Sequence, residues 1–134
     1  MAKLRVVVED LNEFINDVMA KLALDVVKNL ASAPSEGGTP IDTGWASANW
    51  IPYVGAPDRS TAGSKPPKGG TASRGQQLAA SNALAASYNR KKGDIVIANN
   101  VPYILTLNDG NSAQAPPGFV QKAIVAAVKG VASA

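Results

Sequence analysis

The stretch Thr39-Pro-Ile-Asp-Thr-Gly-Trp-Ala-Ser-Ala-Asn-Trp50 separates a long helical pattern from everything that follows it in this chain. Pro40 cannot continue a helix, because its ring fixes φ and pushes the preceding residue toward extended geometry. Asp42, Thr43 and Gly44 have the chemistry of a turn, since an Asx side chain can bond the backbone two residues on and glycine tolerates a positive φ. We therefore interpret Pro40, Asp42, Thr43 and Gly44 as a structural turn, with a positive φ at Gly44.

The only two tryptophans of the chain, Trp45 and Trp50, lie at the end of this turn. A tryptophan can bury roughly 150–250 Å², so the pair is expected to fix the first helix onto a sheet. Further along the chain, Tyr103 and Phe119 are the other expected packing anchors. We expect these two rings to share one cluster at the start of the last helix.

The residues before the turn follow a single amphipathic helix pattern. Apolar residues recur at i, i+3, i+4 and i+7 spacing over 11–30. Asp10 suits the N-cap position, and Glu13 stands three residues later to complete a capping box. We therefore predict a helix from Asp10 to about Ala31.

Two further expectations concern this helix. The residues over 4–8 fit either a short strand or an arm that precedes the helix, because periodicity does not distinguish the two. Phe14 and Met19 lie on the apolar stripe, and we expect both in the core.

After the turn, short strand patterns alternate with helical ones. We expect, in chain order, a strand over 49–54, a loop over 55–75, a helix over 76–89, a turn over 90–94, a strand over 94–98, a short helix over 103–108 and a last helix from 119 to the C-terminus. Pro52 lacks an N–H, so the first strand belongs at a sheet edge or contains a bulge. The second strand is apolar on both faces, which is typical of a strand inside a sheet.

These elements predict an α+β fold within a single domain over 1–134. A long N-terminal helix and a C-terminal helix are expected to pack on a small, mainly antiparallel sheet, with a long basic loop over 55–75. The chain has 134 residues, a length that can bury about two-thirds of the unfolded surface in one core. No apolar run approaches the roughly 18 residues of a membrane span, so no membrane partner is expected.

Composition argues against an enzyme. The chain contains neither cysteine nor histidine, which removes the commonest metal ligands and the commonest general base. Asp42 and Asp109 stand beside glycines, where capping explains them. Ser64 and Lys65 are adjacent, but a mobile loop is a poor place to hold a nucleophile and its base in register. We expect no catalytic residue, no metal and no cofactor; a hydrolase of unknown type would have only its carboxylates for support.

The charge of the chain is uneven. Residues 58–92 hold seven basic residues against Asp58 alone, so the rest of the chain is net acidic. A structureless loop longer than about 15 residues is uncommon in a compact domain unless it is functional or disordered. The cations Arg59, Lys65, Lys68 and Arg74 are therefore our candidates for a loop that faces DNA or a neighbouring subunit. A solvated basic loop without a partner fits the charges equally well.

Three spaced segments carry a resemblance to a known family: Thr39-Pro-Ile-Asp-Thr-Gly44, Asn100-Val-Pro-Tyr-Ile-Leu-Thr-Leu-Asn-Asp-Gly110 and Ala115-Pro-Pro-Gly-Phe-Val-Gln-Lys-Ala123. In this order they resemble the neck and tail-completion proteins of tailed bacteriophages, a group that includes the minor tail protein Z-like and related tail-component families. The resemblance covers most of the chain but leaves out the basic loop.

The resemblance implies a structural virion protein, made in the host cytoplasm, that joins the portal and head to the tail. It further implies a ring of identical subunits, hexameric or dodecameric, between portal or head-completion proteins on one side and tail-tube or terminator proteins on the other. DNA would pass through such a ring without sequence-specific contact. The basic segment leaves a second interpretation open, a small DNA-binding or packaging accessory protein that neutralises phosphates.

Overall fold

The computed structural model describes the backbone of residues 2–132 and the side chains of residues 9–132. Its elements are α1 (Ala2–Ala31), the 3-10 helix η1 (Pro34–Glu36), α2 (Trp45–Ala48), β1 (Ile51–Val54), α3 (Gly75–Ser87), the 3-10 helix η2 (Arg90–Lys92), β2 (Ile95–Ala98), α4 (Ile104–Asn108) and α5 (Phe119–Ala132). The predicted α+β class is confirmed, with both long terminal helices packed on a small antiparallel sheet.

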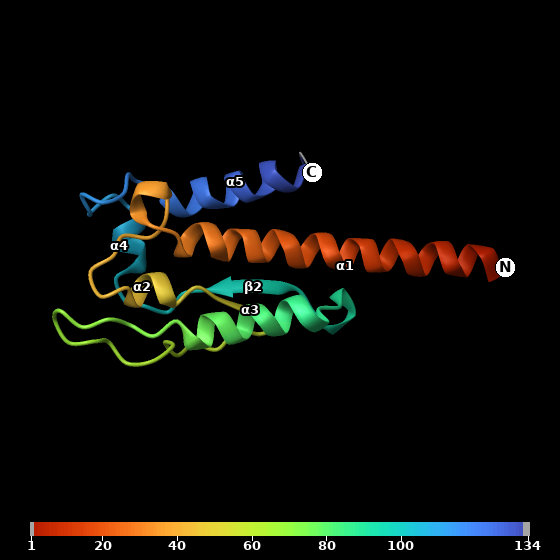
Figure 1. Ribbon diagram of the computed structural model, residues 1–134, viewed down its shortest axis with the longest axis horizontal. Helices are drawn as coiled ribbons and strands as arrows, with labels where there is room; N and C mark the ends of the chain where they lie inside the picture. The colour runs from red at the N-terminus through yellow and green to blue at the C-terminus, as the bar shows by residue number, and fades with distance from the viewer. Residues whose placement is uncertain (1, 133–134) are drawn as a thin grey trace.

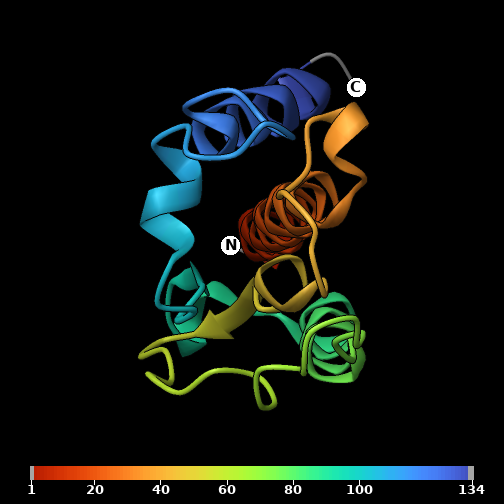
Figure 2. The same ribbon diagram turned by 90° about the vertical axis from the view of Figure 1, so that its left-hand side faces the viewer.

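The elements lie in layers around α1 (Figure 1). Helix α5 runs along one side of α1, and the sheet lies on the other side, with α3 packed against β1 beyond it. The sheet has two strands, β1 and β2, which pair antiparallel in a register that places Ile51 opposite Ala98 and Pro52 opposite Ile97. Seen along α1, the remaining segments surround that helix (Figure 2).

Two apolar clusters hold the layers together. The first joins α1, Trp50 and α5, and its buried members are Val26, Leu30, Trp50, Ala115, Phe119, Ala123 and Ala127. The second lies beside the turn and is built on Trp45, Ala46 and Val101. Ile104 and Leu107 of α4 pack against both clusters, so α4 links the core of the long helices to the turn.

The two ring anchors expected to share a cluster are separate. Phe119 is 1% exposed in the first cluster, whereas Tyr103 packs against the second. The expectation that the two rings share one cluster was wrong; the two clusters are connected instead by Ile104 and Leu107, which pack against both.

Helix α1 differs from the prediction at its N-terminus. It begins at Ala2, so Asp10 is not an N-cap but an exposed residue within the helix, and the segment 4–8 is helical. Phe14 is 64% exposed and does not belong to the core, while Met19 is half-buried. The sequence pattern cannot distinguish an apolar stripe that is covered by the fold from one that is left uncovered.

The second strand also differs. β2 lies in a two-stranded sheet and is therefore an edge strand, not an interior one. Its four apolar residues are all half-buried, so an apolar run that predicts an interior strand belongs here to an edge strand that is only partly covered. The predicted helices over 76–89, 103–108 and from 119 are present, displaced by at most two residues at the ends that the structure describes.

Candidate functional site: the turn and the basic loop

The turn after α1 is fixed by a buried threonine. The Thr39 hydroxyl donates to the carbonyl oxygen of Leu30, at 2.7 Å, and accepts a hydrogen bond from Nε1 of Trp50, at 2.8 Å. Thr39 is fully buried, and Trp50 is 7% exposed. One hydroxyl therefore joins the C-terminal end of α1 to the residue that precedes β1, which is the connection that the sequence pattern predicts for this stretch.

Gly44 makes the turn possible. Its φ is +81°, in the left-handed region, as predicted, and it lies immediately before α2. A side chain in this region strains the backbone, and a β-branched one does so most. The exposed Asp42 and the buried Thr43 precede it, and the carbonyl oxygen of Thr43 accepts a hydrogen bond from the backbone amide of Ala72, at 2.8 Å. The turn thus holds the far end of the basic loop.

Asn49 holds the middle of the same loop. Its side chain is 2% exposed; its Oδ1 accepts from the backbone amide of Ala62, at 2.6 Å, and its Nδ2 donates to the carbonyl oxygens of Ala62, at 3.3 Å, and Trp45, at 2.8 Å. The Asn49 amide thus binds both the N–H and the carbonyl oxygen of Ala62, as a paired backbone residue in a sheet would. The loop is thereby bound to α2 although it has no helix or strand of its own.

Asn100 holds the beginning of the loop, and its neighbour Asn99 binds helix α2. Asn100 Nδ2 donates to the carbonyl oxygens of Asp58, at 2.8 Å, and Ser60, at 3.1 Å. Asn99 Nδ2 donates to the carbonyl oxygen of Ala46, at 2.8 Å. These contacts define the path of the loop within the single chain.

Arg74 is a structural residue rather than a loop cation. Its guanidinium donates to Ser47 Oγ, at 2.8 Å, and to Gln77 Oε1, at 3.2 Å. Gln77 is 4% exposed, and its Nε2 donates in turn to the carbonyl oxygens of Ser47, at 2.8 Å, and Trp50, at 3.3 Å. Because its guanidinium is hydrogen-bonded within this partly buried network, Arg74 is not among the cations that could face a partner.

Lys65, near the middle of the loop, lies over an aromatic pair. Its Nζ is 5.9 Å from the ring centroid of Tyr103, a cation–π distance, and the Tyr103 and Trp45 centroids are 6.1 Å apart with a tilted geometry. Burial raises the pKa of Tyr103, and the negative charge of Asp42 raises it further, so the phenol is neutral at physiological pH. The buried Nε1 of Trp45 has no hydrogen-bond acceptor within the described residues.

The basic residues of 58–92 do not form one patch. Arg59, Lys65 and Lys68 are exposed on the loop, while Arg90–Lys92 lie at the opposite end of α3 (Figure 1). Helix α3 has 13 residues, a length of about 20 Å at 1.5 Å per residue. None of the three loop cations has an ion-pair partner within the described residues, since Asp58 binds the backbone amide and hydroxyl of Ser60, at 2.9 and 3.0 Å. These hydrogen bonds lower the pKa of Asp58.

Neither a metal site nor a membrane-spanning helix is present among the residues that the structure describes. Within residues 9–132, no group of three Asp or Glu side chains is placed to hold a metal ion. No helix over 2–132 is both long and apolar enough to span a bilayer.

The residues that build this site were partly missed by sequence analysis. Pro40, Asp42, Thr43 and Gly44 do form the turn, but Asn49 and Asn100 carry the loop contacts. Gln77 and Asn99 bind the backbone of α2. The only signal for Asn49 in the sequence is its place between two apolar stretches, where a buried amide must find partners. No pattern in the sequence indicates which loop backbone those partners belong to.

Comparison with known proteins adds no relative. Neither a protein-family model, nor a curated protein, nor a solved structure matches the chain.

Proposed function

We propose that this chain is a structural protein of a tailed bacteriophage, a neck or tail-completion component that joins the head to the tail. The observation that carries the proposal is the way the basic loop is built. A polar, glycine-rich segment is given a fixed path by Asn49, Asn100 and the turn, yet its cations Arg59 and Lys68 remain exposed. Preorganised, unpaired charge on a rigid support favours recognition of another macromolecule.

Three further features support a structural role. The resemblance of the turn and of the 100–110 and 115–123 segments to neck proteins accounts for the elements that frame the loop. The described side chains hold no cluster of carboxylates that would serve as a metal site. Several large apolar side chains are exposed, among them Leu105 at 76% and Leu78 at 59%, as expected of a subunit that covers apolar surface only on assembly.

The second candidate is a small DNA-binding or packaging accessory protein. The exposed loop cations Arg59, Lys65 and Lys68 favour it, because lysine and arginine can neutralise phosphates without sequence readout. The separation of these residues from Arg90–Lys92 by helix α3 counts against it, since three cations give a weaker and less salt-dependent contact than six.

A loop variant separates the two candidates. Arg59, Lys65 and Lys68 are changed to Ser together, while Arg74 is kept because it holds Ser47 and Gln77. The matched control changes the exposed lysines Lys28, Lys91 and Lys92 to Ser, which removes the same charge elsewhere. Each protein is assayed for duplex-DNA binding by fluorescence anisotropy over a range of salt, and for joining of purified tails to filled heads.

In the connector account, the isolated protein binds DNA weakly at physiological salt. The loop variant joins tails to heads poorly, and the control joins them normally. Tight, salt-sensitive DNA binding that the loop variant loses, together with normal head–tail joining, would establish the DNA-binding candidate instead.

A further inference from the structure

Strand β2 has one edge without a hydrogen-bonded neighbour. The backbone amide of Gly55 donates to the carbonyl oxygen of Asp94, at 2.8 Å, so these two residues form a hydrogen-bonded pair at the end of the β1–β2 ladder. Bonded and non-bonded pairs alternate along an antiparallel ladder, and the register therefore assigns Ile95 and Ile97 to non-bonded pairs. The N–H and C=O groups of Ile95 and Ile97 thus point away from β1.

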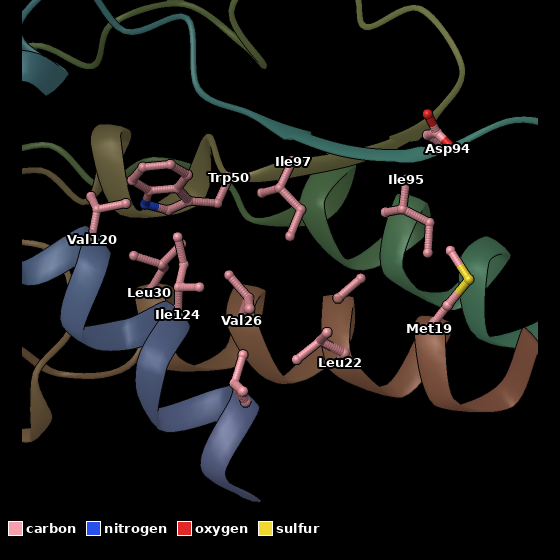
Figure 3. A pocket seen from close by; sticks show the side chains of 12 residues that line it. Met19, Leu22, Val26, Leu30, Trp50, Asp94, Ile95, Ile97, Val120 and Ile124 are labelled. Atoms are coloured by element: carbon pink, nitrogen blue, oxygen red, sulfur yellow. The ribbon is translucent and has the colours of Figure 1, made fainter. Parts of the chain in front are cut away.

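These outward groups have no partner of their own. Within residues 2–132, no backbone or side-chain group is hydrogen-bonded to the outward N–H and C=O of Ile95 or Ile97. Both side chains are half-buried and point from β2 toward α1 (Figure 3). They line a groove of about 460 Å³ between β2, α1 and α5. The edge therefore combines unpaired backbone groups with apolar side chains beside them.

The outer edge of β1 is blocked, in contrast to that of β2. Pro52 stands opposite Ile97 in the register, so its backbone also faces outward, and proline has no N–H to donate. Strand β2 consists only of Ile, Val and Ala. It has no charged residue, proline or bulge of the kind with which proteins protect an open edge. The sheet can therefore be extended at β2 but not in the same way at β1.

We propose that β2 pairs antiparallel with β2 of a second copy of the chain, which joins two two-stranded sheets into one. The free edge is complementary to itself. When Ile95 of one copy lies opposite Ile97 of the other, every outward N–H of the two strands meets an outward C=O. The two-fold axis then passes between the two Val96 residues. Such a contact is closed, and Pro52 keeps the joined sheet from growing further.

The side chains fit the same register. Ile95 of one copy and Ile97 of the other become cross-strand neighbours on the α1 face, and β-branched pairs of this kind stabilise a sheet. Asp94 lies opposite Ala98, so the Asp94 residues of the two copies are kept four positions apart, about 13 Å along the strands. A sheet of two strands is only marginally stable without further strands or helices. The inference does not rest on the proposed function, since the pair forms in the free protein.

A proline at the edge tests the intermolecular hydrogen bonds. Ile95 is the first residue of β2, a position where proline is tolerated, and its N–H takes no part in the β1 ladder. Ile95→Pro should keep its helical content but weaken dimer formation in sedimentation about tenfold or more. The matched control, Ile95→Val, has a side chain of similar size and keeps the N–H, so it should dimerise almost as well as wild type.

Two results of sedimentation would overturn the proposal. One is a wild-type protein that is monomeric at concentrations of tens of micromolar. The other is an Ile95→Pro variant that dimerises as well as wild type.

Amide hydrogen exchange identifies the edge that is paired. The N–H of Ile97 is bonded only in the dimer, whereas the N–H of Ala98 is bonded to Ile51 within the chain. At equal concentration, the Ile97 amide should exchange about tenfold or more slowly in wild type than in Ile95→Pro. The Ala98 amide should exchange at similar rates in both proteins. Equal rates for Ile97 would show that this edge is not the interface.

Single cysteines test the register, because the native chain has none. Residues in a non-bonded antiparallel pair have Cα atoms about 4.5 Å apart, within the roughly 4.4–6.8 Å that a disulfide spans. Val96→Cys alone should therefore form a disulfide-linked dimer on mild oxidation, and a mixture of Asp94→Cys and Ala98→Cys should link the two different variants. Asp94→Cys alone is the control and should not link. Efficient linking by Asp94→Cys alone, or no linking by Val96→Cys, would contradict the proposed pairing.

Discussion

Nε1 of Trp50 donates to Oγ1 of Thr39, at 2.8 Å, in a part of the molecule from which water is excluded. The same hydroxyl donates to the carbonyl oxygen of Leu30, at 2.7 Å. Thr39→Val keeps the shape of the side chain but leaves the indole N–H without an acceptor. We expect this variant to lose about 1–3 kcal/mol of unfolding free energy, the cost of one unpaired buried polar group. Thr39→Ser keeps the hydroxyl and should lose about 1 kcal/mol or less; urea unfolding of both variants checks the difference.

The two tryptophans should lose different amounts of stability when the indole N–H is removed. Trp50→Phe removes the donor to Thr39, whereas Trp45→Phe removes an N–H that has no acceptor within the described residues. Both side chains are 7% exposed, so the two substitutions create cavities of similar kind. Trp50→Phe should therefore be less stable than Trp45→Phe by about 1 kcal/mol. Equal losses in thermal or urea unfolding would show that the Trp50–Thr39 hydrogen bond does not contribute to stability.

Gly44 should tolerate only residues that enter the left-handed region. With φ at +81°, Gly44→Val should destabilise the chain by more than about 1 kcal/mol, because β-branched residues are strained there. Gly44→Asn should cost less, since asparagine is enriched in this region. A melting temperature that is unchanged in the valine variant would show that the conformation of this turn does not contribute to the stability of the fold.

Asn49 should control the order of the basic loop. Asn49→Ala removes both hydrogen bonds to the backbone of Ala62 and the one to Trp45. We expect trypsin to cleave after Arg59 or Lys68 several-fold faster in this variant, because local opening exposes the loop at a lower free-energy cost. The control is Asn111→Ala, which removes a single exposed hydrogen bond to Thr106 and should leave cleavage of the loop unchanged.

The turn and the helices were predictable because their signals are local. Gly44, Pro40 and the apolar spacing before Leu30 each act through the residue's own backbone or its neighbours within a turn of helix. Helix α5 and the two strands were located for the same reason. The start of α1 was predicted wrongly because an aspartate such as Asp10 suits an N-cap position as well as an exposed position within a helix. The helix in fact begins at Ala2.

The candidate site was less predictable because its contacts join distant segments. Arg74 was assigned to the loop from its charge alone, but its partner Ser47 is 27 positions away. Asn49 and Asn100, which give the loop its path, bind loop backbone atoms 13 to 42 positions away. Whether Phe14 is covered depends on where α5 and β2 end. The apolar pattern of α1 alone does not indicate where those elements lie.

The most direct test of the central claim is to omit this chain from phage assembly. The proposal implies that a tailed phage encodes the chain, and particles of that phage made without the chain are fractionated by density and viewed by electron microscopy. The account predicts filled heads and separate tails, and their joining when the purified chain is added back. Complete, infectious particles formed without the chain would contradict a role in joining heads to tails.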